Sequence, residues 1–99
     1  MDQYPLEKYF DDAANQIKEQ KKNLKKEPTS DDLLKLYGYF KFANLGKNNT
    51  PKPGMFSFEA KAKWEGWNSC DATCQQDAKH KYVLCAMQFL PNSVTSNYQ

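Results

Sequence analysis

Apolar residues recur at helical spacing in four stretches of the chain, separated by polar links. The first stretch carries a stripe with a period of about 3.6 residues, which is typical of an amphipathic helix. The stripe consists of Leu6, Phe10, Ala13, Ile17 and Leu24. The pair Glu27-Pro28 is expected to end this helix, because proline disfavours helical conformation in the residue before it.

A second helix has clear start and stop signals. Thr29 or Ser30 can cap its first turn with a hydroxyl. Asp31 and Asp32 follow at once, where the positive end of the helix dipole favours carboxylates. Gly46 is predicted to stop the helix in a left-handed conformation. The apolar positions between these signals are Leu33, Leu36, Tyr37, Phe40 and Ala43.

Two shorter helices are predicted in the second half of the chain. A polar loop over 47–54 precedes them, since it contains two prolines and a glycine. The third helix is expected roughly from Ser57 to Asn68. Its packed side is predicted to carry Phe56, Ala60, Trp64 and Trp67. The fourth is expected to begin at a Thr73 cap and to stop at Pro91. Its apolar positions are Ala78, Tyr82, Cys85 and Phe89.

These elements predict an all-α fold, a four-helix bundle with brief links and one longer loop. The chain has 99 residues, which is enough for one domain and no more. We expect the domain to occupy residues 1–91. The polar segment 92–99 is expected to be a flexible tail.

Composition excludes several classes of function. The formal net charge is only +2, and the basic side chains other than His80 are all lysine. Major-groove reading by bidentate arginine is therefore disfavoured, whereas lysine still suits phosphate. The three cysteines lack CxxC spacing and are interpreted as reduced thiols rather than zinc ligands. The start of the chain has no signal-peptide pattern, and its longest apolar run is far shorter than the ~20 residues of a membrane span. A soluble, cytoplasmic protein is expected.

Three residues of the predicted second helix could form a ligand site. Tyr37, Phe40 and Lys41 are spaced i, i+3 and i+4, so two rings and an ammonium share one face. That combination suits a ligand with an aromatic base and a phosphate. The alternative is that both rings belong to the core and Lys41 is merely solvated. The residues alone leave both interpretations open.

Other candidate residues favour structural roles. Trp64 and Trp67, flanked by Lys61 and Lys63, are more typical of packing than of a site. His80 lies in a lysine-rich stretch near Cys74 and Cys85, and it is interpreted as a surface residue rather than a partner of a nucleophilic cysteine. The common nucleotide and hydrolase motifs do not occur, so no enzyme is predicted.

Several motifs occur in an order that resembles the acyl-CoA-binding protein family. They are Leu36-Tyr37-Gly38-Tyr39-Phe40-Lys41-Phe42-Ala43-Asn44-Leu45-Gly46, Pro53-Gly54-Met55, Lys61-Ala62-Lys63-Trp64-Glu65-Gly66-Trp67-Asn68 and Asp77-Ala78-Lys79-His80-Lys81-Tyr82-Val83. The resemblance runs from Phe10 to about Leu90, which is most of the chain. It implies a four-helix bundle with a ligand in a surface groove.

The resemblance also implies which residues hold the ligand. The 3′-phosphate and adenine of the coenzyme are expected near Tyr37, Phe40, Lys41, Lys63 and Tyr82. Ala14 and Lys18 match positions near the nucleotide, and Leu33 and Leu34 match positions that cover the acyl chain. The implied function is binding and intracellular carriage of medium- to long-chain acyl-CoA esters by a monomer. Catalysis, a cofactor, a nucleic-acid partner and membrane insertion are not expected.

The chain departs from the family pattern at several positions. Phe40 replaces a tyrosine, so a ring remains but a hydroxyl is lost. Gly66 replaces the alanine between the tryptophans. Phe42, Asn44 and Lys47 also differ from the family residues. The link from Lys18 to Pro28 is expected to be about four residues longer than usual. These differences bear on affinity and chain-length preference rather than on ligand class.

Three other functions remain as alternatives. A helical interaction module could use the aromatic patch to bind a partner helix. An enzyme that uses acyl-CoA would need a paired nucleophile, which the sequence does not offer. Nucleic-acid binding has only the mild lysine excess in its favour.

Overall fold

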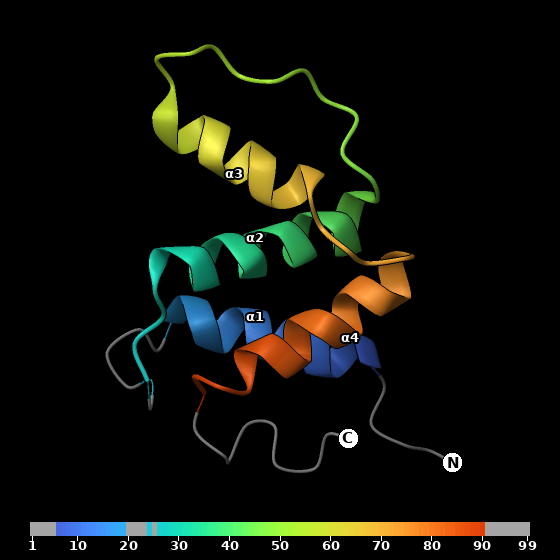
Figure 1. The fold of residues 1–99 in the computed structure, drawn as a ribbon. Helices are drawn as coiled ribbons and strands as arrows, with labels where there is room; N and C mark the ends of the chain where they lie inside the picture. The colour runs from blue at the N-terminus through green and yellow to red at the C-terminus, as the bar shows by residue number, and fades with distance from the viewer. Residues whose placement is uncertain (1–5, 20–23, 25, 91–99) are drawn as a thin grey trace.

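The computed structural model describes residues 6–19, 24 and 26–90, and the regular structure in these ranges is entirely helical. It comprises α1 (Leu6–Glu19), α2 (Ser30–Leu45), α3 (Phe58–Asn68) and α4 (Gln75–Ala86). The all-α prediction is therefore confirmed. The order of helices along the chain is not their order in space. α2 lies in the middle, with α4 and α1 on one side and α3 on the other (Figure 1).

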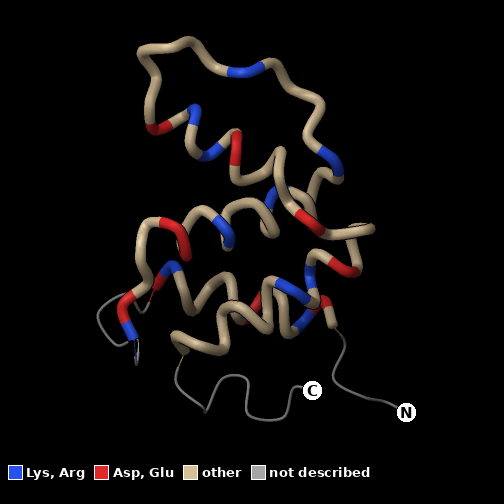
Figure 2. The backbone as a smooth tube through the Cα atoms, viewed as in Figure 1, with Lys and Arg blue, Asp and Glu red and all other residues tan. Residues whose placement is uncertain are grey.

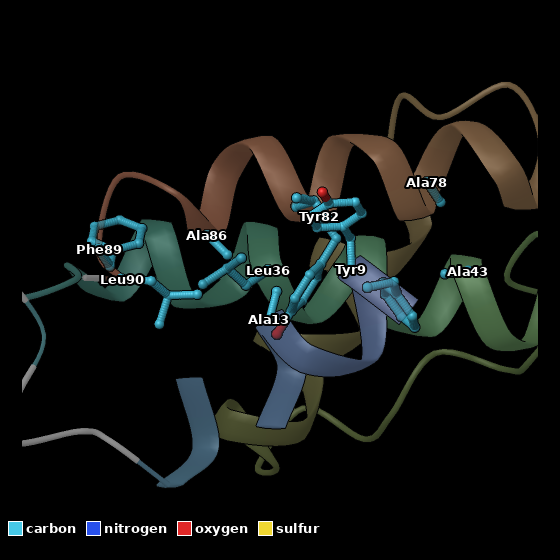
Figure 3. Close-up of a cluster of buried hydrophobic side chains, with 11 residues drawn as sticks. Tyr9, Ala13, Leu36, Ala43, Ala78, Tyr82, Ala86, Phe89 and Leu90 are labelled. Carbon is cyan, nitrogen blue, oxygen red and sulfur yellow. The ribbon is translucent and has the colours of Figure 1, made fainter. Parts of the chain in front are cut away.

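The core lies between α1, α2 and α4 (Figure 3). α1 contributes Tyr9, Phe10 and Ala13, and α2 contributes Leu36 and Ala43. The remaining core residues are Ala78, Tyr82, Val83 and Ala86 of α4, with Phe89 and Leu90 just after it. Small alanines on facing helices allow close approach, and the aromatic rings fill the remaining space. α3 adds nothing to this cluster, so α2 is held in the core by residues of α1 and α4.

Both ends of α2 follow the sequence prediction. The Thr29 hydroxyl accepts a hydrogen bond from the Asp32 N–H at 3.1 Å, and the Thr29 N–H donates to the Asp32 carboxylate at 2.9 Å. This reciprocal pair is a capping box, in which the carboxylate takes the position of the usual glutamate. At the other end Gly46 has a φ of 83°, a conformation that strongly favours glycine.

The predicted extent of the first helix is wrong. α1 ends at Glu19, and Leu24 and residues 26–29 are not helical. Leu24 nevertheless packs against the core. Its place in the apolar stripe therefore reflects burial, which a non-helical segment can also achieve.

The predicted limits of the fourth helix also need correction. Cys74, not Thr73, is the N-cap residue, and its sulfur accepts from the Asp77 N–H at 3.4 Å. The Thr73 N–H instead donates to the Asp77 carboxylate at 2.9 Å. α4 ends at Ala86, before Phe89, whose ring is buried in the turn that follows. Pro91 and the predicted tail 92–99 lie outside the described residues.

α3 is attached to α2 through backbone contact, to the end of α2 through the Trp67 indole, and to the loop between the two helices through the Trp64 indole. A Cβ on Gly38 would lie 2.3 Å from the Gly66 carbonyl oxygen, so the two backbones nearly touch. The Trp67 Nε1–H donates to the Gly46 carbonyl at 2.8 Å, and the Trp64 Nε1–H donates to the Thr50 carbonyl at 2.9 Å. The packing interpretation fits Trp67, which is buried, and the two indole bonds also hold the loop, which the sequence did not predict.

The packed side of α3 was only partly predicted. Phe56 precedes the helix and is 85% exposed, and Ala60 is exposed as well. Trp67 is the residue of α3 that is buried. The spacing rule failed for Phe56 because the backbone turns at residues 55–56 before α3 begins at Phe58.

Candidate functional site

A groove opens between α1 and α2, with a wall from α4. Its volume is about 290 Å³. Three helices line it. The lining residues are Ala14, Asn15, Ile17 and Lys18 of α1, Leu33, Leu36, Tyr37 and Phe40 of α2, and Tyr82 of α4. Six of the residues predicted for the site, from three helices, are therefore brought together here. They are Ala14, Lys18, Leu33, Tyr37, Phe40 and Tyr82.

Two aromatic rings that line this groove, Phe40 and Tyr82, pack on the buried ring of Phe10. The ring centroids of Phe40 and Phe10 are 5.8 Å apart and the rings are stacked, and those of Phe10 and Tyr82 are 5.2 Å apart and edge to face. Phe40 and Tyr82 are 6.1 Å apart. Phe10 is buried, whereas Phe40 keeps 39% of its surface exposed. Phe40 is therefore held in place from below while a face remains open to a planar ligand group.

The Tyr82 ring is 4% exposed, and burial raises the pKa of its hydroxyl to about 12. The cause is desolvation, which penalises the phenolate. Tyr82 is therefore a neutral phenol throughout the physiological range. Such a hydroxyl can donate a hydrogen bond to an anionic oxygen that enters the groove.

Two lysines from different helices converge on the Tyr37 ring. The Lys41 Nζ lies 5.9 Å from the ring centroid of Tyr37, and the Lys63 Nζ lies 5.7 Å from the same centroid. Lys41 also lies over the Trp67 ring at 5.1 Å, and Lys63 forms an ion pair with Glu59 at 3.4 Å. Trp67 and the α2–α3 contact thus hold both ammonium groups at one edge of the groove.

This arrangement favours the binding interpretation of the second helix over the core interpretation. Tyr37 and Lys41 are half-buried, and Phe40 is more exposed still. Neither ring belongs to the buried core cluster. The face they form has the two rings and the ammonium that a base and a phosphate need.

Leu34 lies on a different side of α2 from the groove, because consecutive helical residues point about 100° apart. It lines a second hollow of about 720 Å³ between α2 and α3. Around it lie Asp31, Asp32, Lys35, Tyr39, Ala62, Glu65, Gly66, Ser69, Cys70 and Asp71. Leu33 remains in the groove and is 50% exposed.

Sequence reasoning missed Asn15, Ile17 and Leu36 as groove residues. The apolar stripe did mark Ile17 and Leu36, but it assigned them to the core. Nothing in the pattern marked Asn15. Phe10 was likewise assigned to the core, and its role as the support of Phe40 depends on a contact between two helices.

Nucleophilic and metal sites are not apparent among the described residues. Cys70, Cys74 and Cys85 are free thiols, and burial raises the pKa of Cys70 and Cys85. A raised pKa disfavours the reactive thiolate. His80 is half-buried on α4 rather than fully on the surface. The described residues contain neither a cluster of three or more metal-ligating side chains nor a helix long and apolar enough to cross a membrane.

Comparison with known proteins matches the chain to one family. A family profile described as Acyl CoA binding protein matches residues 7–86. Acyl-CoA-binding protein homolog 1 of Caenorhabditis elegans is 46% identical over 81 residues, which is 82% of this chain and 90% of that protein. The Acyl-CoA-binding protein homolog of Drosophila melanogaster is 41% identical over 74 residues, which is 75% of this chain and 81% of that protein.

A larger enzyme contains a similar segment. Enoyl-CoA delta isomerase 2 of Homo sapiens is 36% identical over 91 residues, or 92% of this chain. The matched part is only 22% of that enzyme. The similarity therefore concerns one module of it.

Solved structures share the arrangement of helices. Oryza sativa Acyl-CoA-Binding Protein 2 superposes with a TM-score of 0.75 at 25% identity, covering 96% of this chain and 100% of that one. ACBP from Moniliophthora perniciosa superposes with a TM-score of 0.72 at 37% identity, covering 80% of this chain and 74% of that one. The four-helix prediction is confirmed by this agreement.

Proposed function

The chain belongs to the acyl-CoA-binding protein family, and we propose that it binds acyl-CoA esters in the groove between α1 and α2 without converting them. Membership of this family confirms the prediction of a binding protein rather than an enzyme. The observation that carries the proposed location is the convergence of Lys41 and Lys63 on Tyr37 at the edge of a partly apolar groove.

The coenzyme end of the ligand is proposed to occupy this lysine-rich edge. Lys41 and Lys63 supply two ammonium groups for the 3′-phosphate, with charge-assisted hydrogen bonds. The exposed face of Phe40 can stack on adenine, and Tyr82 can donate its phenolic hydrogen. Lys18 borders the groove from α1 and offers a further cation to the phosphates.

The acyl tail is proposed to leave the groove along the start of α2. Ala14 and Leu33 provide apolar surface inside the groove. A tail that continues over the first turn of α2 reaches Leu34 on its other side, so both leucines can cover part of a long chain. Each methylene that is buried contributes up to ~0.8 kcal/mol.

The biological role follows from these proposals. A protein that holds both ends of the ester, without changing it, is suited to carrying and buffering medium- to long-chain acyl-CoA. We propose that it acts as a cytoplasmic monomer, without a cofactor and without a nucleic-acid partner.

Calorimetric titration with palmitoyl-CoA, free coenzyme A and free palmitate tests the proposal. The whole ester should bind far more tightly than either half, because both halves share one association cost. Equal affinity for palmitate and palmitoyl-CoA would instead make the protein a fatty-acid carrier. Release of free coenzyme A during the titration would indicate an enzyme.

A further inference from the structure

The hollow between α2 and α3 differs in chemistry from the groove. Its volume is about 720 Å³, against about 290 Å³ for the groove. Its lining includes the carboxylates of Asp31, Asp32, Glu65 and Asp71 but a single ammonium group, that of Lys35. Figure 2 shows acidic positions at the start of α2, on α3 and on the connection from α3 to α4. None of the described residues that line the groove is acidic. The hollow therefore suits hydrogen-bond donors better than methylene groups.

The acyl tail can reach this hollow from the groove across the first turn of α2. Leu33 lines the groove and Leu34 lines the hollow, and the Cα atoms of neighbouring residues are about 3.8 Å apart. Beyond Leu34 the apolar surface continues to Ala62 on α3. Glu65 follows three residues later on the same side of α3, which is about 4.5 Å along the helix. A tail that covers both leucines therefore ends beside the Glu65 carboxylate.

The polar wall at this end of the hollow is held by hydrogen bonds. The Tyr39 hydroxyl donates to the Asp71 carboxylate at 2.9 Å, and the Ser69 hydroxyl donates to the Glu65 backbone carbonyl at 2.7 Å. The Glu65 carboxylate forms an ion pair with Lys52 at 3.3 Å. An ionised carboxylate has about four acceptor positions, so that of Glu65 can accept a further hydrogen bond.

The group at the end of the tail decides how well it fits this wall. A methyl group displaces water from the carboxylates and returns no hydrogen bond, so it gains little. A hydroxyl group replaces that water, whereas a terminal carboxylate is repelled by the acidic lining. We propose that the hollow selects acyl-CoA esters whose tail ends in a hydroxyl group, and that Glu65 accepts its hydrogen bond. This inference rests on the proposed function, since the groove must hold the coenzyme end of the same ester.

Calorimetric titration of the full chain with three esters of equal chain length tests the proposal. They are palmitoyl-CoA, 16-hydroxypalmitoyl-CoA and the CoA monoester of hexadecanedioic acid, which differ in the terminal group alone. The hydroxy ester should bind at least as tightly as palmitoyl-CoA, and the diacid ester roughly tenfold or more weakly than the hydroxy ester. A hydroxyl forced against apolar surface would instead weaken binding roughly tenfold relative to palmitoyl-CoA, and that result would overturn the proposal. Equal binding of the hydroxy and diacid esters would place the tail end in bulk solvent and would overturn it as well.

Glu65→Leu tests the assigned acceptor. This variant should bind palmitoyl-CoA more tightly and the hydroxy ester more weakly, so the ratio of the two affinities should change roughly tenfold in favour of palmitoyl-CoA. Lys52→Gln breaks the ion pair but keeps the Glu65 carboxylate, and it should keep the wild-type ratio. Glu19→Leu makes the same substitution at an exposed position of α1 outside both the groove and the hollow, and it should also keep that ratio.

The outcomes separate this inference from the proposed function. An unchanged affinity ratio in a folded Glu65→Leu variant would overturn the role of the hollow, and thermal unfolding shows whether the variant is folded. Tight binding of palmitoyl-CoA together with weak binding of the hydroxy ester would overturn the inference alone. Absence of binding of all three esters by the wild type would overturn the proposed function and the inference together.

Discussion

At the scale of single residues, Phe40 carries the clearest departure from the family pattern. Its ring stacks on Phe10 and keeps an exposed face in the groove. Phe40→Ala should weaken palmitoyl-CoA binding roughly tenfold or more, because stacking on a base contributes about 1–3 kcal/mol. Phe40→Tyr keeps the ring and adds a hydroxyl, so its affinity should be unchanged or slightly higher.

Calorimetry of both Phe40 variants measures these affinities, and thermal unfolding shows whether each is folded. Wild-type affinity in a folded Phe40→Ala would move the adenine away from this ring. Leu84→Ala is a suitable control, since Leu84 lies on α4 outside the groove and is partly exposed.

Lys41 and Lys63 are predicted to act on the same phosphate. Each Lys→Ala variant should lose roughly ten- to a hundredfold in affinity for acyl-CoA, as expected for a charge-assisted hydrogen bond. The two losses should not add, because the residues share one partner. Calorimetry of the two single variants and the double variant measures this coupling.

A ligand without the 3′-phosphate provides the control for both lysines. With palmitoyl-dephospho-CoA the same substitutions should cost little, since the group they serve is gone. If each variant loses as much affinity for palmitoyl-dephospho-CoA as for palmitoyl-CoA, the lysines bind the diphosphate instead. No loss with either ligand would make them solvated charges.

The residue scale also shows what a sequence can and cannot reveal about the site. The i, i+3, i+4 spacing of Tyr37, Phe40 and Lys41 correctly placed them on one helix face. The convergence of Lys63 on that face depends on how α3 crosses α2, and a local pattern has no information on the crossing. Asn15 was missed for the same reason, because a polar residue becomes part of a groove only through its neighbours.

At the scale of helices, the crossing of α2 and α3 depends on two glycines. A Cβ on Gly38 would lie 2.3 Å from the Gly66 carbonyl oxygen, a backbone atom that cannot move alone. Gly38→Ala should therefore destabilise the protein by about 1–3 kcal/mol, although alanine normally favours a helix. It should also weaken acyl-CoA binding, because the alanine displaces α3 and so moves the Lys63 ammonium away from the Tyr37 ring.

Chemical denaturation and calorimetry measure the two effects of Gly38→Ala. Gly54→Ala is the matched control, because nothing lies within 4 Å of a Cβ at that position and its stability and affinity should be those of the wild type. Unchanged stability in Gly38→Ala would mean that the helices can separate without cost.

Two capping carboxylates predict how stability depends on pH. The Thr29 N–H bond lowers the pKa of Asp32 from its ordinary value of 3.8, and the Thr73 N–H bond lowers that of Asp77. A lowered pKa in the folded state means that the contribution is complete above the unfolded pKa of about 3.9 and is lost as the pH falls through the folded pKa.

The free energy of unfolding should therefore fall as the pH drops below about 4, and part of this fall belongs to these two groups. The variant Asp32→Asn/Asp77→Asn keeps the side-chain shape and removes the titration. Urea denaturation across this range should show a shallower pH dependence for the variant. An identical dependence would show that other carboxylates account for it.

Helix limits show how far periodicity extends. The start of α2 was predictable because a capping box is a local chemical signal, and so was its glycine stop. The end of α1 was not, because Leu24 is buried without being helical. The spacing of Phe89 likewise placed it in the fourth helix, but Phe89 is buried beyond the end of α4. Regular spacing of apolar residues indicates which residues are buried. It indicates a helix only where the backbone remains helical over the same residues.

At the scale of the whole molecule, the fold divides into a body and an attached helix. α1, α2 and α4 share the buried core, whereas α3 contributes nothing to it and is held by Trp67 and the two glycines. Few buried apolar contacts imply a low free energy of local opening. α3 should therefore exchange its amide hydrogens faster than α4 in the free protein.

A bound ligand should slow exchange in α3, because the proposed site joins α3 to the body through Lys63. With palmitoyl-CoA at about 100 times its dissociation constant, opening that breaks the site is opposed by up to roughly 2.7 kcal/mol, and exchange in α3 should slow by as much as a hundredfold. Hydrogen exchange followed by mass spectrometry on peptides from 6–19, 30–45, 58–68 and 75–86 measures all four described helices. Lys63→Ala should lose much of the protection in α3 while keeping it in α1 and α2. Ligand protection confined to α1, α2 and α4 in the wild type would show that α3 stands outside the site, and it would contradict the role of Lys63.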